Sequence, residues 1–200
     1  MKSKFLLSIA AAAAALMPMI ATGQVMPEKR PSVDHGAPAY KYEAYAGFAY
    51  TSMNQLNLSR YGLMGGKAGL TRDYGRHFGI TATGDYYRVA TGTGNPGNPS
   101  VWSITAGPEF RATLYGNVDG FVHVLAGGEH TGGEGMTPDV SPAIAFGGGL
   151  LYNLSQRWGI RASGDKAYDR FSLANNTPQL NYSPHWHSNA RATIGVVFRF

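Results

Sequence analysis

The last twelve residues of the chain, NARATIGVVFRF, change character from one residue to the next. Neighbouring side chains of a β-strand point to opposite faces, so residues 189–200 would form a strand with one apolar and one polar face. The apolar face carries Ala190, Ala192, Ile194, Val196, Phe198 and Phe200, and the other face carries Asn189, Arg191, Thr193, Gly195, Val197 and Arg199. This pattern predicts a strand with a different environment on each side.

Seven further segments show strand-like alternation. We expect strands at 40–51, 61–72, 77–90, 100–114, 118–130, 142–154, 158–169 and 188–200. Each is long enough to cross a bilayer as a tilted strand, which takes about 9–11 residues. The pattern therefore indicates an all-β chain of eight membrane-spanning strands.

The predicted connections alternate in length. Three are short, at 73–76, 115–117 and 155–157, whereas the intervening ones are longer, as in 91–99 and 172–187. Short turns at one end and long loops at the other are typical of transmembrane barrels. An open sheet would leave unpaired edges, which hydrocarbon does not tolerate, so the first strand should pair with the last. The expected fold is an eight-stranded antiparallel up-and-down transmembrane β-barrel spanning 40–200.

The beginning of the chain predicts export. Residues 1–23 combine Lys2 and Lys4 with an Ala-rich apolar stretch and a small-residue site, as a secretory signal peptide does. Residues 24–39 show no period and are expected to form a flexible periplasmic leader. Loss of the two lysines with the signal lowers the net charge from +5 to +3, and no basic run or zinc-finger spacing is present, so nucleic-acid binding is not expected.

Charge is scarce in this chain. Asp, Glu, Lys and Arg make up 14% of the residues, where soluble domains average roughly 25%. There is no cysteine, which excludes a disulfide framework and cysteine metal sites. Low charge without an apolar helix after residue 23 favours a membrane barrel with a polar interior. The reverse orientation, a secreted lipocalin-like barrel with apolar ligand-binding interior, stays open on alternation alone.

The signal peptide, the eight strands, the GPEF run at 107–110 and the closing GVVFRF resemble the OmpA-like family of small outer-membrane β-barrels. The resemblance covers residues 40–200 and implies a monomer in the lipid of the outer membrane of a Gram-negative bacterium. It also implies that Ile194, Val196, Phe198 and Phe200 form the signal read by the barrel-assembly machinery. Nothing follows Phe200, so the family's periplasmic peptidoglycan-binding domain is expected to be absent.

Charged residues on the polar faces are candidate functional residues. They are Asp85, Glu109, Arg111, Glu129, Arg161, Asp165 and Arg191, with Glu43 and His123 also assigned to the interior. Charges removed from water need partners, so we expect an ion-pair network across the barrel. This network either fills the interior or, as the resemblance suggests, rearranges at Arg161 or Arg191 to open a narrow ion path.

The run His185-Trp186-His187-Ser188 is the most suggestive of catalysis. Lipid A deacylases of this fold carry His-x-Ser on a strand, which places base and nucleophile on one face. Here His187 and Ser188 are adjacent and should face opposite ways. The two histidines are interpreted as surface-loop residues, since a metal site usually needs three or four ligands. No catalytic residue, cofactor or metal is expected.

The function expected from the sequence is a non-enzymatic outer-membrane barrel with a structural or surface-contact role. Loops on a rigid scaffold are the usual place for binding, so 91–99, 131–141 and 172–187 are the candidate contact surface. A narrow ion channel, a lipid A-modifying enzyme and a soluble ligand carrier are the alternatives.

Overall fold

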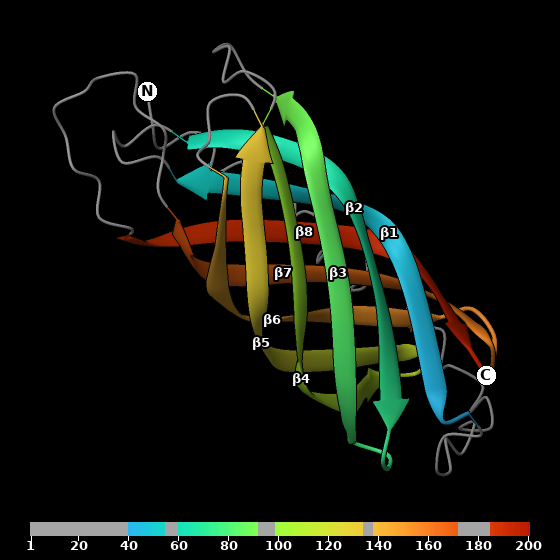
Figure 1. Ribbon diagram of the computed structural model, residues 1–200. Coiled ribbons are helices and arrows are strands. Elements are labelled where there is room, and N and C mark those ends of the chain that lie inside the picture. The colour runs from blue at the N-terminus through green and yellow to red at the C-terminus, as the bar shows by residue number, and fades with distance from the viewer. Residues whose placement is uncertain (1–39, 55–59, 92–98, 134–137, 172–184) are drawn as a thin grey trace, which may run out of the picture. The chain divides into compact units, whose positions relative to one another are not determined.

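Eight antiparallel strands form one closed barrel in the computed structural model, which describes residues 40–54, 60–91, 99–133, 138–171 and 185–200 (Figure 1). In chain order the strands are β1 (Tyr42–Asn54), β2 (Arg60–Asp73), β3 (Phe78–Thr91), β4 (Pro99–Tyr115), β5 (Val118–Gly133), β6 (Asp139–Asn153), β7 (Trp158–Phe171) and β8 (His185–Arg199). Each strand pairs with its neighbours in sequence. The predicted all-β, up-and-down architecture is confirmed.

Pairing of the first strand with the last closes the barrel. The register runs from Glu43 opposite Arg199 to Ser52 opposite Ala190. Two further backbone hydrogen bonds join Tyr42 and Phe200 beyond the ladder, at 3.1 and 2.9 Å. No strand is left with an unpaired edge in the hydrocarbon, as a membrane-spanning sheet requires.

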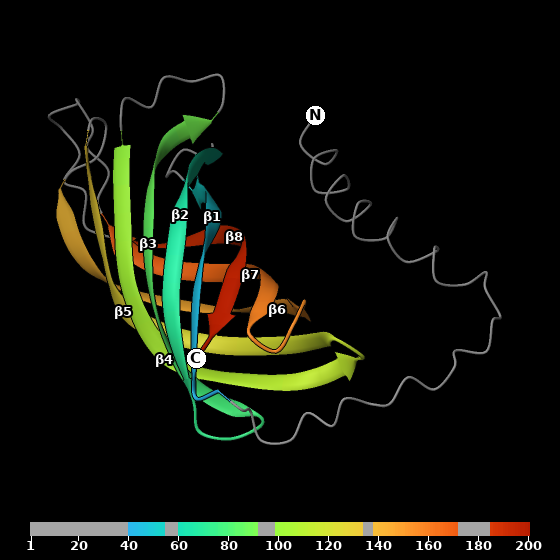
Figure 2. The same cartoon turned by 90° about the vertical axis from the view of Figure 1, so that its right-hand side faces the viewer.

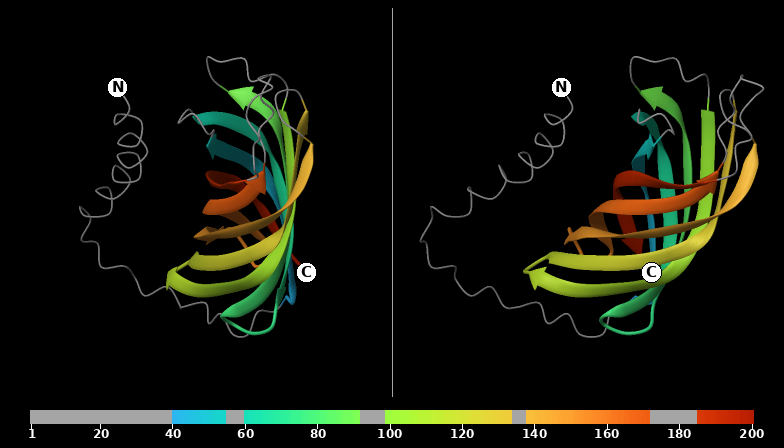
Figure 3. Two further views of the ribbon diagram at one scale, coloured as in Figure 1. Left: turned by 60° about the vertical axis from the view of Figure 1, so that its left-hand side comes forward. Right: turned by 90° about the vertical axis from the view of Figure 1, so that its left-hand side faces the viewer.

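Three short turns lie at one end of the barrel, which we call the turn end; the opposite end is the loop end. The turns follow β2, β4 and β6, as the sequence predicted, and Gly116 in the second has a φ of +52°. The hairpin of β4 and β5 projects beyond the neighbouring strands (Figures 2 and 3). Residues 112–115 are accordingly exposed on both faces.

The barrel is polar inside and apolar outside. Buried positions include thirteen hydrophobic residues and a larger set of polar and charged ones, while every strand carries exposed large hydrophobic side chains. Ile104, Val122 and Ile194 are more than half exposed. A water-soluble barrel needs the opposite arrangement, so the lipocalin-like alternative is wrong. Among the described residues, no helix is both long and apolar enough to cross a membrane.

Several predictions fall outside the described residues. The signal peptide at 1–23 and the leader at 24–39 are among them, as is most of the candidate contact surface. The described parts of that surface correct the predicted loop boundaries, because 131–133 belong to β5, 139–141 to β6 and 185–187 to β8.

Candidate functional site in the barrel interior

The inward faces of the strands bring charged side chains of both signs to the barrel axis. Within the described residues these are the carboxylates Glu43, Asp85, Glu109, Glu129, Asp165 and Asp169, and the cations Lys67, Arg111, Arg161, Arg191 and Arg199. Removal of an unpaired charge from water costs several kcal/mol or more. The geometry of the interior is therefore set by how these groups pair.

Arg161 lies at the centre of a cluster near the turn end. Its guanidinium donates to both oxygens of Glu109, with N–O distances of 2.6 and 3.2 Å, and reaches Glu43 at 3.5 Å. Its flat face lies 3.7 Å from the ring centre of Phe121 and 4.7 Å from that of Tyr45. A guanidinium suits this position, because it can bind a carboxylate at its edge and an aromatic ring on its face.

Glu43 pairs with three arginines, which come from three other strands. Arg111 of β4 donates to its two oxygens at 3.0 and 3.1 Å, and Arg199 of β8 donates to one of them at 3.0 Å. Arg111 also contacts Glu109 at 2.6 Å. Bidentate pairing of this kind fixes orientation as well as charge, so the strands on opposite sides of the barrel are tied together at the turn end.

A second group of charges lies at the middle of the barrel. His123 approaches Asp165 through Nε2 at 2.9 Å and Glu109 through Nδ1 at 3.7 Å. Lys67 lies 2.9 Å from Asp165 and 3.8 Å from Asp85. His123 thus joins the middle group to the turn-end cluster, and Lys67 joins it to the charges nearer the loop end.

Arg191 organises the group nearest the loop end. It forms ion pairs with Glu129, with Asp85 at 3.5 Å and with Asp169 at 3.5 Å. Asn189 donates to both oxygens of Asp169 at 2.8 and 2.9 Å. Here three carboxylates surround one guanidinium, the reverse of the balance around Glu43.

All seven charged residues singled out from the sequence lie in the interior, and each takes part in an ion pair. Sequence reasoning missed Lys67, Asp169 and Arg199 as members of the network. Alternation could have placed Arg199, because it shares a face with Arg191. The contact of Lys67 with Asp165, a residue 98 positions away, leaves no mark in the local sequence.

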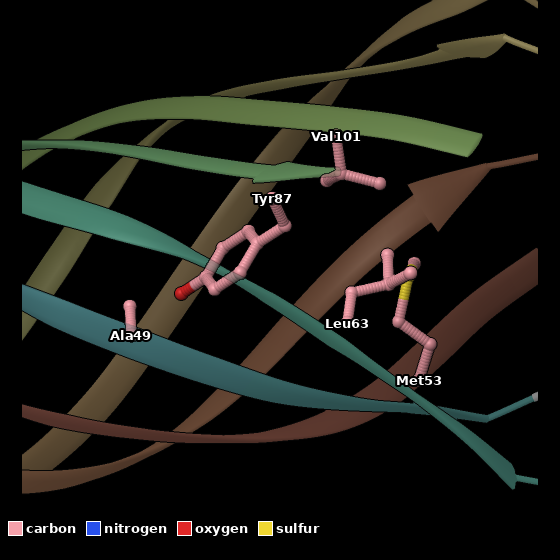
Figure 4. Close-up of a cluster of buried hydrophobic side chains, with 5 residues drawn as sticks. All are labelled: Ala49, Met53, Leu63, Tyr87 and Val101. Carbon is pink, nitrogen blue, oxygen red and sulfur yellow. The ribbon is translucent and has the colours of Figure 1, made fainter. Parts of the chain in front are cut away.

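Apolar side chains complete the filling of the interior. Tyr45, Phe121, Leu151 and Val197 form a cluster at the turn end around Arg161. Toward the loop end, two further clusters are Ala49, Met53, Leu63, Tyr87 and Val101, shown in Figure 4, and Leu125, Ala145 and Ala167. Arg191 lies 5.8 Å from the ring centre of Tyr87. Apolar side chains thus pack beside the charged groups of the interior, and both have little exposed area.

The outer surface has the features of a lipid-facing belt. Exposed aliphatic residues are bordered by aromatic rings near the strand ends, as the two interfaces of a membrane barrel require. At the turn end Trp158 packs on Phe198 at 4.8 Å, and Tyr42 stacks on Phe200 at 5.7 Å. Toward the loop end Trp102 lies 5.4 Å from His130. The outer face therefore fits a bilayer.

The histidine run differs from its sequence interpretation. His187 is not a surface-loop residue but lies in β8, buried on the inward face and opposite Asp169 in β7. The strand begins at His185, three residues before the predicted start, so His187 belongs to the barrel wall and not to a loop. Ser188 lies on the other face, as the adjacency predicted. No group of three potential ligands among the described residues could hold a metal ion.

Comparisons with known proteins rest on structure alone. No protein-family model matches the sequence, and no curated protein matches it. Neisserial surface protein A is similar in structure, with a TM-score of 0.64 and 12% identity over 82% of this chain and 99% of that one. The outer membrane protein OprG from Pseudomonas aeruginosa has a TM-score of 0.55 and 12% identity over 83% of this chain and 98% of that one.

These likenesses establish the fold: the chain has the eight-stranded β-barrel fold of small outer-membrane proteins. The apolar belt and aromatic rings of its own outer surface agree with that class. The predicted location, the outer membrane, follows from the class.

Proposed function

We propose that the protein is a non-enzymatic scaffold of the outer membrane, closed to ions, that presents its strand connections for contact. The observation that carries this proposal is the filled interior, in which charged side chains from all parts of the barrel pair with one another. A barrel of eight strands has room for side chains and little else.

Opening this interior would require simultaneous loss of several contacts. Arg161 would have to leave Glu109 and Glu43 and withdraw from the ring of Phe121. Each buried charge left without a partner costs several kcal/mol. The ion pairs that offset the cost of burying these charges thus also support the closed state.

The scaffold role places recognition outside the barrel body. Rigid frameworks commonly carry their binding residues on connecting segments, and the segments concerned are the parts of 91–99, 131–141 and 172–187 that lie outside the strands. One similar structure bears the name surface protein, which agrees with a role of this kind. Since the barrel closes within one chain, no second copy is needed to complete the sheet.

Planar-bilayer recording of the refolded protein tests the closed scaffold. A folded barrel, shown by a heat-dependent shift on a gel, should give no discrete conductance steps. Steps in the wild type that change in amplitude in Arg161→Ala would overturn the proposal and establish a path through the interior.

A narrow ion channel is the second candidate, and one geometric feature favours it. Arg161, Lys67 and Arg191 each lie within 4 Å of at least two carboxylates, so each cation has an alternative partner within reach. Exchange of partners could open a path without leaving a charge unpaired. The recordings described above separate the two functions.

The absence of enzymatic activity is part of the proposal. His187 and Ser188 face opposite sides of β8, which is unsuitable for a base and its nucleophile. Overexpression should leave the acylation of lipid A unchanged, as mass spectrometry of extracted lipid A would show. Loss of one acyl chain in cells that express the wild type, but not Ser188→Ala, would contradict this expectation.

A further inference from the structure

The exposed charged side chains on the described part of the chain have one sign. Among the described residues, the exposed titratable side chains other than tyrosine are all Lys, Arg or His. They are Lys41, Arg72, Arg76, His77, Arg88, Arg157 and Lys166. The described aspartates and glutamates are all buried or half-buried. The barrel therefore presents a basic surface outside and uses its acids inside.

Four of these cations lie along one continuous arc at the turn end: Lys41, Arg72, Arg76 and Arg157, which we call the basic arc. Backbone hydrogen bonds join the segments that carry its members: the Arg199 N–H donates to the carbonyl oxygen of Arg157 at 2.9 Å, the Tyr42 N–H to that of Phe200 at 3.1 Å, and the Asp73 N–H to that of Lys41 at 2.9 Å. The arc thus runs from the β6–β7 turn across β8 and β1 to the end of β2 and the β2–β3 turn. The arc has a net positive charge even when the C-terminal carboxylate at Phe200 is included.

Aromatic rings hold two of the cations at the level of the membrane interface. The guanidinium of Arg72 lies 4.9 Å from the ring centre of Tyr74 and 5.9 Å from that of Tyr42. Arg157 donates from Nε to the hydroxyl of Tyr40 at 3.0 Å and lies 5.6 Å from that ring centre. Interfacial tyrosines sit at headgroup depth, so these cations lie where phosphates of the lipid would be.

We propose that the basic arc binds the phosphate groups of anionic phospholipids in the leaflet that surrounds the turn end. Charge complementarity selects an anion, and continuity with the aromatic belt selects a lipid headgroup over a soluble acidic partner. Basic residues at a membrane surface attract anionic lipid. The inference rests on the membrane fold and is independent of whether the interior conducts.

Native mass spectrometry of the refolded protein tests this binding. The protein is released from detergent micelles doped with equal amounts of phosphatidylglycerol and phosphatidylcholine, and the retained lipid adducts are counted. The wild type should retain phosphatidylglycerol preferentially, and Arg72→Gln with Arg76→Gln and Arg157→Gln should weaken that preference by on the order of fivefold per removed cation.

A matched control removes two exposed cations outside the arc. Arg88→Gln with Lys166→Gln lowers the net charge but lies on β3 and β7 away from the turns, and should leave the preference nearly unchanged. An equal loss in this control would assign the effect to overall charge and overturn the proposal, as would an unchanged preference in the triple variant.

Two further arms keep the result decisive. Excess inorganic phosphate should not displace the retained lipid; full displacement would indicate a simple anion site and contradict lipid binding. If the triple variant does not fold, Arg157→Gln alone serves, because this exposed turn residue contacts Tyr40 through its side chain and belongs to none of the ion pairs of the described interior. A single variant with wild-type lipid preference would then overturn the role of Arg157 and with it the arc.

Discussion

At the scale of single residues, Arg161 shows how the barrel tolerates buried charge. Its substitution by Met leaves Glu109 and Glu43 with fewer donors, and removal of one partner of a buried pair costs about 3–5 kcal/mol. We expect Arg161→Met to lower the free energy of unfolding by that amount, measured by urea titration in phospholipid vesicles.

The double variant Arg161→Met with Glu109→Gln provides the control. Because it removes both charges of the 2.6 Å pair, it should recover part of the lost stability. Additive losses would show that the two side chains do not stabilise one another, contrary to their geometry.

Ile194 tests the lipid-facing side of the same barrel. It is 57% exposed on the outer face of β8, and Arg near the bilayer midplane costs about 2–4 kcal/mol. Ile194→Arg should therefore assemble poorly in membranes, while Ile194→Leu should assemble like the wild type. Equal assembly, judged by heat-modifiable mobility in membrane fractions, would contradict the assigned orientation.

Thr193, on the other face of β8, shows where alternation stops being informative. Alternation alone predicts that Arg is tolerated there, because the residue faces the polar interior. The structure leaves Thr193 only 9% exposed in a filled interior, so a large side chain would overpack it. Alternation indicates which face a residue occupies, whereas the space beside it depends on strands distant in sequence.

The interior network was predictable only in part, for a similar reason. Arg161 and Asp165 share the polar face of one strand, and this is visible in the sequence. Lys67 stands in a glycine-rich segment with little alternation, where a register shift between Met64 and Gly65 adds irregularity. His187 was misplaced because β8 starts earlier than predicted. Pairings across the barrel, such as Glu43 with Arg111, depend on closure and not on local pattern.

At the scale of elements, glycines allow close strand approach where the sheet curves. A Cβ built on Gly149 of β6 would collide with the carbonyl oxygen of Ala162 in β7, whereas one built on Gly164 in β7 meets nothing within 4 Å. Residues 149 and 164 lie on adjacent paired positions of the same two strands. The two glycines therefore form a matched pair for substitution.

Gly149→Ala should destabilise the barrel by roughly 1–3 kcal/mol, the usual cost of forcing extra atoms into a packed region. Gly164→Ala should change the free energy of unfolding little. Urea titration of both variants in identical vesicles compares them directly, and similar losses would show that close approach at Gly149 is not a constraint.

The last strand carries a separate proposal about assembly. We propose that Ile194, Val196, Phe198 and Phe200 are read by the barrel-assembly machinery before β8 pairs with β1. In the folded barrel Phe200 stacks on Tyr42 and Phe198, so its loss has a structural effect as well. Phe200→Ala should slow assembly in cells more than it slows spontaneous refolding in vesicles.

Comparison of the two rates separates recognition from stability. Tyr42→Ala removes the same stacking contact without changing the terminal residue, and should slow both processes to a similar extent. If Phe200→Ala slows both processes equally, loss of the stacking contact explains the whole effect, and the assembly role is contradicted.

Strand limits were the part of the fold best predicted from sequence. The predicted segment 118–130 and the observed β5, Val118–Gly133, begin at the same residue. The loop-end limits were less accurate: β6 begins at Asp139, earlier than the predicted 142. At the turn end, glycine and polar residues show where a strand stops. At the loop end, the strands continue beyond the segment in which apolar and polar residues alternate, so the sequence pattern ends before the strand does.

At the scale of the whole molecule, the proposed closed state would have two levels in series. One level surrounds Arg161, with Phe121 and Leu151 beside it, and the other surrounds Arg191, with Tyr87 beside it. Lys67 and His123 join the two levels. A path for ions must pass both levels, so the opening of one is not enough.

This arrangement predicts that Arg161→Ala and Arg191→Ala will each remain electrically silent in planar bilayers, because the other level stays closed. The double variant should conduct in discrete steps, provided that a gel shows it to be folded. Conductance in either single variant would mean that one level alone closes the barrel. Silence of a folded double variant would mean that the apolar side chains close the interior without the arginines, and the charge network would then serve only to satisfy the buried carboxylates.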